Sequence, residues 1–120
     1  MIKSFTDLEA WRTGHKFVVR IYVVTKKFPK DEIYGITSQL RRAVVSVTSN
    51  IAEGFSRKSK REKTQFYCMS LGSLTKTQNL LAVCLDVGYL LRKDFNELGE
   101  ETVQVSKLIN GLIKSAQDKQ

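Results

Sequence analysis

Four stretches of this chain repeat apolar residues at intervals of three and four, which is the spacing of one face of an α-helix. They run from Thr6 to Pro29, from Ser38 to Gly54, from Ser59 to Gly88 and from Asp94 to Ala116. No stretch alternates apolar and polar residues in the manner of a half-buried strand. The connections are short, and short connections make neighbouring helices antiparallel. The sequence therefore predicts an all-α fold, an antiparallel up-down four-helix bundle that forms a single domain over residues 1–120.

Capping patterns and helix-breaking residues set the expected helix ends. Capping residues mark the starts of the first, third and fourth helices at Thr6, Ser59 and Asp94. Helix breakers mark three ends at Pro29, Gly54 and Gly88. The core face predicted for the third helix includes Met69 and Val87, and residues 117–120 are expected to fray.

The second helix carries an unusual polar face beside its apolar one. The apolar face consists of Leu40, Ala43, Val44, Val47 and Ile51, and the polar face of Arg42, Ser46, Asn50 and Glu53. Small amides and hydroxyls suit a close contact better than open water, so we assign Ser46, Asn50 and Glu53 to a structural or subunit contact. We expect Asn50 and Glu53 to satisfy backbone groups at the turn into the third helix. A buried Glu53 would need an arginine partner from a neighbouring helix or subunit, either Arg42 or Arg57.

The first helix is apolar over an arc too wide for one bundle seam to bury. Nearly every residue from Phe17 to Val24 is apolar. A contact with another subunit would bury the surplus apolar surface. We therefore expect a homo-oligomer, with Trp11 and Tyr22 of this helix in the interface.

A dense group of positive charges follows the second helix. It consists of Arg57, Lys58, Lys60, Arg61 and Lys63, opposed only by Glu62. The chain has a net charge of +8, which favours polyanionic partners without identifying one. In an isolated chain these cations could equally form a solvated loop, but an oligomer repeats the cluster and multiplies its field. A second possible surface, a basic groove or an oligomer pore, is formed by Arg41, Arg42 and Lys76.

Nothing in the sequence favours catalysis, a metal site or a cofactor. His15 is the only histidine, it lacks the glutamate three residues earlier that di-iron bundles carry, and we expect it in the core or at an interface. Cys68 and Cys84 lie about 24 Å apart along one helix, so we expect two buried thiols in a reducing compartment. The uncharged runs are too short to span a membrane, and the N-terminus lacks an apolar signal core. The sequence predicts a non-enzymatic cytoplasmic protein.

Several short motifs resemble one bacterial family. They are LEAW at Leu8–Trp11, FP at Phe28–Pro29, EIYG at Glu32–Gly35, QLRRA at Gln39–Ala43, NIAEG at Asn50–Gly54 and LGS at Leu71–Ser73. In this order they resemble the four helix bundle protein family. Its members are typically encoded by intervening sequences in large-subunit ribosomal RNA genes, and they are often labelled ribosomal proteins. The chain is similar, too, to the accessory protein of diversity-generating retroelements, which works beside a reverse transcriptase.

The resemblance implies a ring-like homo-oligomer, commonly a pentamer. The chain departs from the family pattern after LGS, where it reads LTKTQ and has Lys76 in place of an expected glutamate. This departure removes any contact made by the acid and makes the third helix more basic.

Together these features favour a non-enzymatic, oligomeric helical bundle that binds structured RNA or other nucleic acid through its basic turns. Few aromatic residues lie near the basic turn, namely Phe55, Phe66 and Tyr67. Their scarcity favours recognition of backbone or shape over base sequence. The alternative is a protein-interaction scaffold whose ring docks a partner such as a reverse transcriptase, without direct RNA binding.

Overall fold

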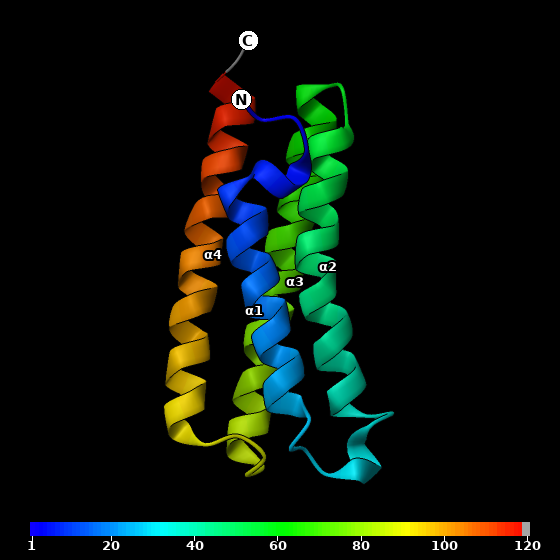
Figure 1. Cartoon of the computed structure of the whole chain (residues 1–120), viewed down its shortest axis with the longest axis vertical. Coiled ribbons are helices and arrows are strands. Elements are labelled where there is room, and N and C mark those ends of the chain that lie inside the picture. Colours follow the sequence, from blue (N-terminus) through cyan, green and yellow to red (C-terminus); the bar gives the residue numbers. More distant parts are fainter. Residues whose placement is uncertain (119–120) are drawn as a thin grey trace.

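The computed structural model describes residues 1–118, which form four long helices (Figure 1). Helix α1 spans Glu9–Thr25, α2 spans Ile36–Ser56, α3 spans Lys60–Asp86 and α4 spans Arg92–Asp118. Short 3-10 helices precede α1 and α2, namely η1 (Phe5–Asp7) and η2 (Lys30–Glu32). Residues 1–118 contain no strand, so the prediction of an all-α chain with four helices is confirmed. Part of the predicted fraying concerns Lys119 and Gln120, which lie outside the described residues, whereas Gln117 still belongs to α4.

Successive helices run in opposite directions along a body of 48 × 25 × 22 Å (Figure 1). Helix α1 packs against α2 and α4, and α3 packs against the same two helices. The α2–α3 connection and the N-terminus lie at one end of the bundle, and the α1–α2 and α3–α4 connections lie at the other (Figure 1). This is the predicted up-down arrangement.

The core is formed by one apolar face of each helix. Its largest fully buried apolar side chains are Phe17, Ile21, Leu40, Val44, Val47, Ile51, Leu74, Leu81, Leu98, Val105 and Ile109. All of them belong to the core faces predicted from the spacing. Burying a side chain of this kind contributes roughly 1.5–3 kcal/mol, and such burial is the main favourable term in folding.

The buried face of α3 differs from the predicted one. Met69 and Val87 are each 54% exposed, because the buried face of the helix is centred instead on Ser70 and Thr77. The Ser70 hydroxyl donates to the carbonyl of Val47 on α2 at 2.7 Å, and the Thr77 hydroxyl donates to a carbonyl one turn earlier at 2.9 Å. Because both hydroxyls are hydrogen-bonded, burying them costs little free energy. The apolar side chains of Met69 and Val87 therefore lie outside the core.

The two cysteines lie in different environments. Cys84 is buried, as predicted, and burial together with the nearby charge of Glu32 raises the pKa of its thiol to about 11. Cys68 is exposed, contrary to the prediction. It lies two residues from the buried Ser70, which places it on nearly the opposite side of the helix.

Both ends of α1 differ from the prediction. The helix begins after η1, because the capping pair is formed by Ser4 and Asp7 and does not involve Thr6 as the cap. The Ser4 hydroxyl accepts a hydrogen bond from the Thr6 amide at 3.2 Å. The Asp7 carboxylate accepts from the Lys3 amide at 2.9 Å and from the Ser4 amide at 3.1 Å, and these backbone hydrogen bonds lower the pKa of Asp7. At its other end α1 stops at Thr25, before the predicted Pro29.

Gly54 does not end α2, which continues to Ser56. Its role is a close approach between helices. A Cβ atom at Gly54 would lie 2.6 Å from Cε1 of Tyr67 and 3.2 Å from Cβ of Phe66, both on α3. Any larger residue would therefore push α2 and α3 apart.

The connection between α3 and α4 confirms one prediction and corrects another. α3 ends close to Gly88, whose φ of 85° lies in the left-handed region that favours glycine. α4 then begins at Arg92, so Asp94 lies in its first turn and is not the predicted cap. An acid in the first turn still interacts favourably with the positive end of the helix.

Candidate nucleic-acid interface

The predicted basic turn is divided between a connection and the start of a helix. We call residues 57–63 the basic segment. Its connecting part consists of Arg57, Lys58 and Ser59, and its helical part includes Lys60, Arg61 and Lys63 in the first turns of α3. Ser59 caps this helix by accepting a hydrogen bond from the Glu62 amide at 3.1 Å, as predicted. The segment forms the end of the bundle beside the N-terminus (Figure 1).

Two cations of the basic segment are engaged within the fold. Arg57 pairs with Glu53 at 3.3 Å, and its guanidinium lies 4.6 Å from the ring centroid of Phe66. Lys63 donates to the carbonyl of Phe55 at 2.7 Å and to the preceding carbonyl at 3.4 Å. Lys63 thus caps the negative end of α2, and partial burial lowers its pKa. These two residues hold the connection in place.

The other three cations are exposed. We call Lys58, Lys60 and Arg61 the outer cations. Within residues 1–118 they form no ion pair and donate no hydrogen bond. They surround the N-terminus of α3, where the aligned backbone dipoles already produce a positive potential and acids are normally favoured. Three cations at this helix end slightly disfavour folding, and they favour binding of an anion at the N-terminus of α3.

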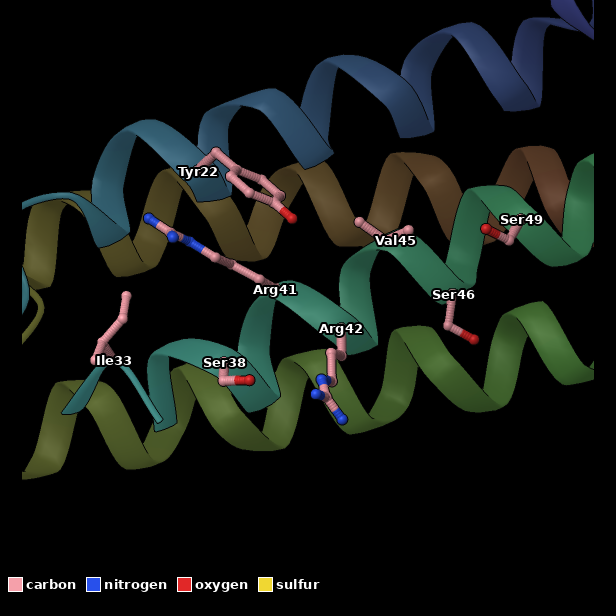
Figure 2. Close-up of a pocket in the computed structure, with 8 residues that line it drawn as sticks. All are labelled: Tyr22, Ile33, Ser38, Arg41, Arg42, Val45, Ser46 and Ser49. Atoms are coloured by element: carbon pink, nitrogen blue, oxygen red, sulfur yellow. The ribbon is translucent and has the colours of Figure 1, made fainter. Parts of the chain in front are cut away.

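A second polar region lies in a groove between α1 and α2 (Figure 2). We call it the α1–α2 groove, and it is lined by Tyr22, Ile33, Ser38, Arg41, Arg42, Val45, Ser46 and Ser49. Arg41 extends toward α1, and Arg42 extends the opposite way, toward α3 (Figure 2). Lys76 is exposed on α3 and does not line this groove. Arg57 directly follows the last residue of α2 and is sixteen residues from Arg41, which corresponds to about 24 Å along the helix, so the groove and the basic segment are separate regions.

The residues predicted at an interface have partners within the chain. Ser46 is hydrogen-bonded to Ser73 of α3 at 2.8 Å, and the Asn50 amide donates to the Ser46 carbonyl at 2.9 Å. Asn50 therefore bonds to its own helix and does not satisfy the turn into α3. Glu53 is not the buried carboxylate we expected: its side chain is 56% exposed, and its partner Arg57 lies one helical turn away in the same chain. Of these pairs, Ser46–Ser73 joins α2 to α3.

Trp11 and Tyr22, the other predicted interface residues, lie along α1. Trp11 packs edge-on against Phe5, with ring centroids 5.3 Å apart, and stacks on His15 at 4.6 Å. His15 is exposed, so it does not lie in the core, and the alternative of a position at an interface stays a prediction. Tyr22 is 39% exposed and lies under the guanidinium of Arg41 at 4.7 Å. Trp11, His15 and Tyr22 lie on one side of α1 and form an aromatic row. Their spacing in the sequence could have predicted this row, which the sequence-based predictions did not include.

The opposite side of the bundle carries paired charges. Arg20 of α1 forms ion pairs with Glu101 at 2.8 Å and with Glu97 at 3.4 Å, both on α4. Burial raises the pKa of Glu101, although the charge of Arg20 acts in the other direction. This face is electrostatically mixed, unlike the end that carries the outer cations.

Within residues 1–118, no group of three or more His, Cys, Asp or Glu side chains is positioned to hold a metal ion. None of the helices in that range is long and apolar enough to cross a membrane.

Residues 6–111 match the family model described as 23S rRNA-intervening sequence protein. The protein belongs to this family. The matched range includes every motif from Leu8 to Ser73 on which the resemblance was based, so that prediction is confirmed.

The fold is shared with a solved structure of the same kind. A protein with unknown function from the S23 ribosomal protein family of Bacteroides thetaiotaomicron superposes with a TM-score of 0.81. The two chains are 20% identical, and the similarity covers 88% of this chain and 95% of that chain. At this identity the likeness shows the fold alone. No curated protein matches the chain.

We predict that Lys63 acts on stability while Lys60 does not. Lys63→Met keeps most of the apolar stem but removes the charged donor from two carbonyls at the end of α2. It should lower the free energy of unfolding by about 1 kcal/mol in urea denaturation. The control is Lys60→Met, an exposed change in the same helix that should stay within about 0.5 kcal/mol of the wild type. Equal stability of the two variants would contradict the structural role of Lys63.

Proposed function

We propose that this protein is a non-enzymatic, oligomeric helical bundle that binds structured RNA or another structured nucleic acid at its basic end. The observation that carries the proposal is the position of the outer cations Lys58, Lys60 and Arg61. They are exposed, they lack partners within residues 1–118, and they surround a helix end that is itself positive. Fold stability favours the opposite charge at such a position, so binding of a polyanion supplies the physical reason for it.

The distribution of acids supports the same ligand class. Helix α2 has no acidic residue from Ile36 to Ala52, and α3 has none from Lys63 to Leu85. Glu53, which follows on α2, is paired with Arg57. A phosphate backbone that approaches along α2 and α3 therefore meets little repulsion. The name of the family, which refers to 23S rRNA, also supports RNA as the ligand.

Self-association would increase the affinity for nucleic acid, because each subunit would contribute its own basic end. Val19 and Val23 on α1 are 49% and 54% exposed, and Met69 on α3 is 54% exposed. These side chains form apolar areas on two different helices, and a closed ring joins two different surfaces of each subunit. In a ring each copy contributes its own outer cations, so several phosphate contacts form in one binding event.

We expect the mass in solution to be several times 13.7 kDa at micromolar concentration, measured by light scattering. Val23→Glu should reduce this mass, because a charge would enter the proposed apolar contact. Lys26→Glu is the control, since it places a glutamate at an exposed position directly after the same helix and should leave the mass unchanged. A monomer mass for the wild type would contradict the proposed oligomer.

Replacing all three outer cations with Gln should weaken binding of a structured RNA. Each lost phosphate contact should reduce the slope of log affinity against log salt by about 0.7–0.9. The slope measured for the triple variant should therefore be smaller by roughly 2–3. The loss should be similar for different RNA sequences, because phosphate contacts carry no sequence information. The control carries the same charge change on the α1–α4 side, with Gln at Lys16, Lys27 and Lys107. An equal loss in both variants would contradict a localised site.

The second candidate function is a scaffold that docks a protein partner such as a reverse transcriptase. The observation in its favour is apolar exposure near the connection of α3 and α4, where Leu91 is 73% exposed beside Val23. Capture of partners with and without nuclease separates the two functions. Partners held through RNA are lost after nuclease treatment, and partners held by the protein surface remain.

A further inference from the structure

The aromatic row on α1 presents an open ring face. Trp11, His15 and Tyr22 are four and seven residues apart, which places them on one side of the helix. The rings of His15 and Trp11 are stacked with centroids 4.6 Å apart and planes within 13° of parallel, and His15 is exposed. One face of the His15 ring is covered by Trp11, and the other face is available to a further ring.

Tyr22 and Arg41 form a second flat surface seven residues farther along α1. The guanidinium of Arg41 lies 4.7 Å from the ring centroid of Tyr22, and its Nε donates to the Thr25 hydroxyl at 2.9 Å. That hydrogen bond fixes the orientation of the guanidinium plane. No hydrogen bond within residues 1–118 uses the two Nη groups of Arg41, so they remain available to a ligand.

The α1–α2 groove extends from the Tyr22–Arg41 pair to the level of His15. A Cβ atom on Gly14 would lie 3.1 Å from Thr48, so the next residues, His15 and Ser49, lie at the same level of the bundle. Ser49 forms one end of the groove and Tyr22 lies toward the other (Figure 2). Seven residues of helix span about 10 Å, which is close to three stacked nucleotides at about 3.4 Å each.

The lining of the groove favours a nucleic acid over a protein helix. None of its residues is acidic, and two of them, Ser38 and Ser49, are serines whose hydroxyls can both donate to and accept from a ligand, whereas the hydroxyl of Ser46 is already bonded to Ser73. Its aliphatic residues are only Ile33 and Val45, too few for the row of apolar anchors that a docked helix requires. Arg42 is exposed and has no ion pair within residues 1–118. Aromatic surfaces beside cations are the usual elements of a site for single-stranded nucleic acid.

We propose that the α1–α2 groove binds an unpaired segment of RNA about three nucleotides long. One base stacks on the open face of His15 and another on the Tyr22–Arg41 pair. Arg41 extends toward α1 and contacts a phosphate of this segment, and Arg42, which extends toward α3, contacts the backbone where the strand leaves the groove (Figure 2). The inference rests on the proposed function and deepens it: the basic segment binds the backbone of helical RNA, and the groove binds an adjoining single strand.

The test uses the full chain and two probes, a uridine decamer and a blunt RNA duplex of the same length. The readout is the fluorescence of Trp11, the one tryptophan of the chain, together with the affinity for each probe. The decamer should change the fluorescence of the wild type. The double variant His15→Ala, Tyr22→Leu should bind the decamer more weakly, by about 5- to 150-fold for each base whose stacking is lost, and should bind the duplex unchanged.

Two controls separate stacking from structural effects. His15→Phe keeps a ring on Trp11 and should retain most of the affinity for the decamer. Val103→Ala, at an exposed position of α4 on the α1–α4 side, should bind both probes as the wild type does. All variants are compared by melting temperature and by mass in solution.

Four results would overturn the inference. The first is a double variant that binds the decamer as tightly as the wild type. The second is a lower mass for the double variant, which would make the groove a subunit interface. The third is a wild type that binds neither probe, which would overturn the proposed function as well. Duplex binding that depends on the outer cations, without any response of Trp11 to the decamer, would overturn this inference and leave the proposed function in place.

Discussion

Helix α2 approaches α3 so closely at Gly54 that the ring of Tyr67 occupies the space of a Cβ atom. The same seam is fixed farther along by the buried Ser70 hydroxyl, which donates to the Val47 carbonyl at 2.7 Å. Because this contact sets the end of α2 against the start of α3, the ammonium of Lys63 reaches the last carbonyls of α2. The three outer cations are exposed and take no part in this contact. The basic end of the bundle is thus a consequence of how tightly two helices pack.

The charges of the bundle are divided between its sides. Acids and bases are paired across α1 and α4, as in the contacts of Arg20 with Glu97 and Glu101. Helices α2 and α3 carry cations with few acids, and two of these cations hold the connection in place while the others face solvent. A polyanion is therefore attracted to one end and one side of the molecule. Base stacking in the α1–α2 groove would add a contact that charge alone does not provide.

The sequence predicted the four helices and most of the core, because apolar spacing alone determines which face of a helix is buried. It failed where a polar residue replaced an apolar one in the core: Ser70 and Thr77 are buried because each hydroxyl finds a carbonyl, which spacing cannot reveal. It also assigned Gly54 to a helix end, because a sequence does not distinguish a glycine that permits close packing of two helices from a glycine that ends a helix. Lys63 was grouped with ligand-binding cations because its partners, two backbone carbonyls, are set by the packing of the helices.

The most direct test of the account is lysine footprinting of the wild-type protein with and without a bound structured RNA. Acetylation rates are measured for individual lysines by mass spectrometry. The account predicts that the RNA slows the modification of Lys58 and Lys60, while Lys16 and Lys107 on the α1–α4 side react at unchanged rates. Bound RNA that leaves Lys58 and Lys60 fully reactive would contradict it.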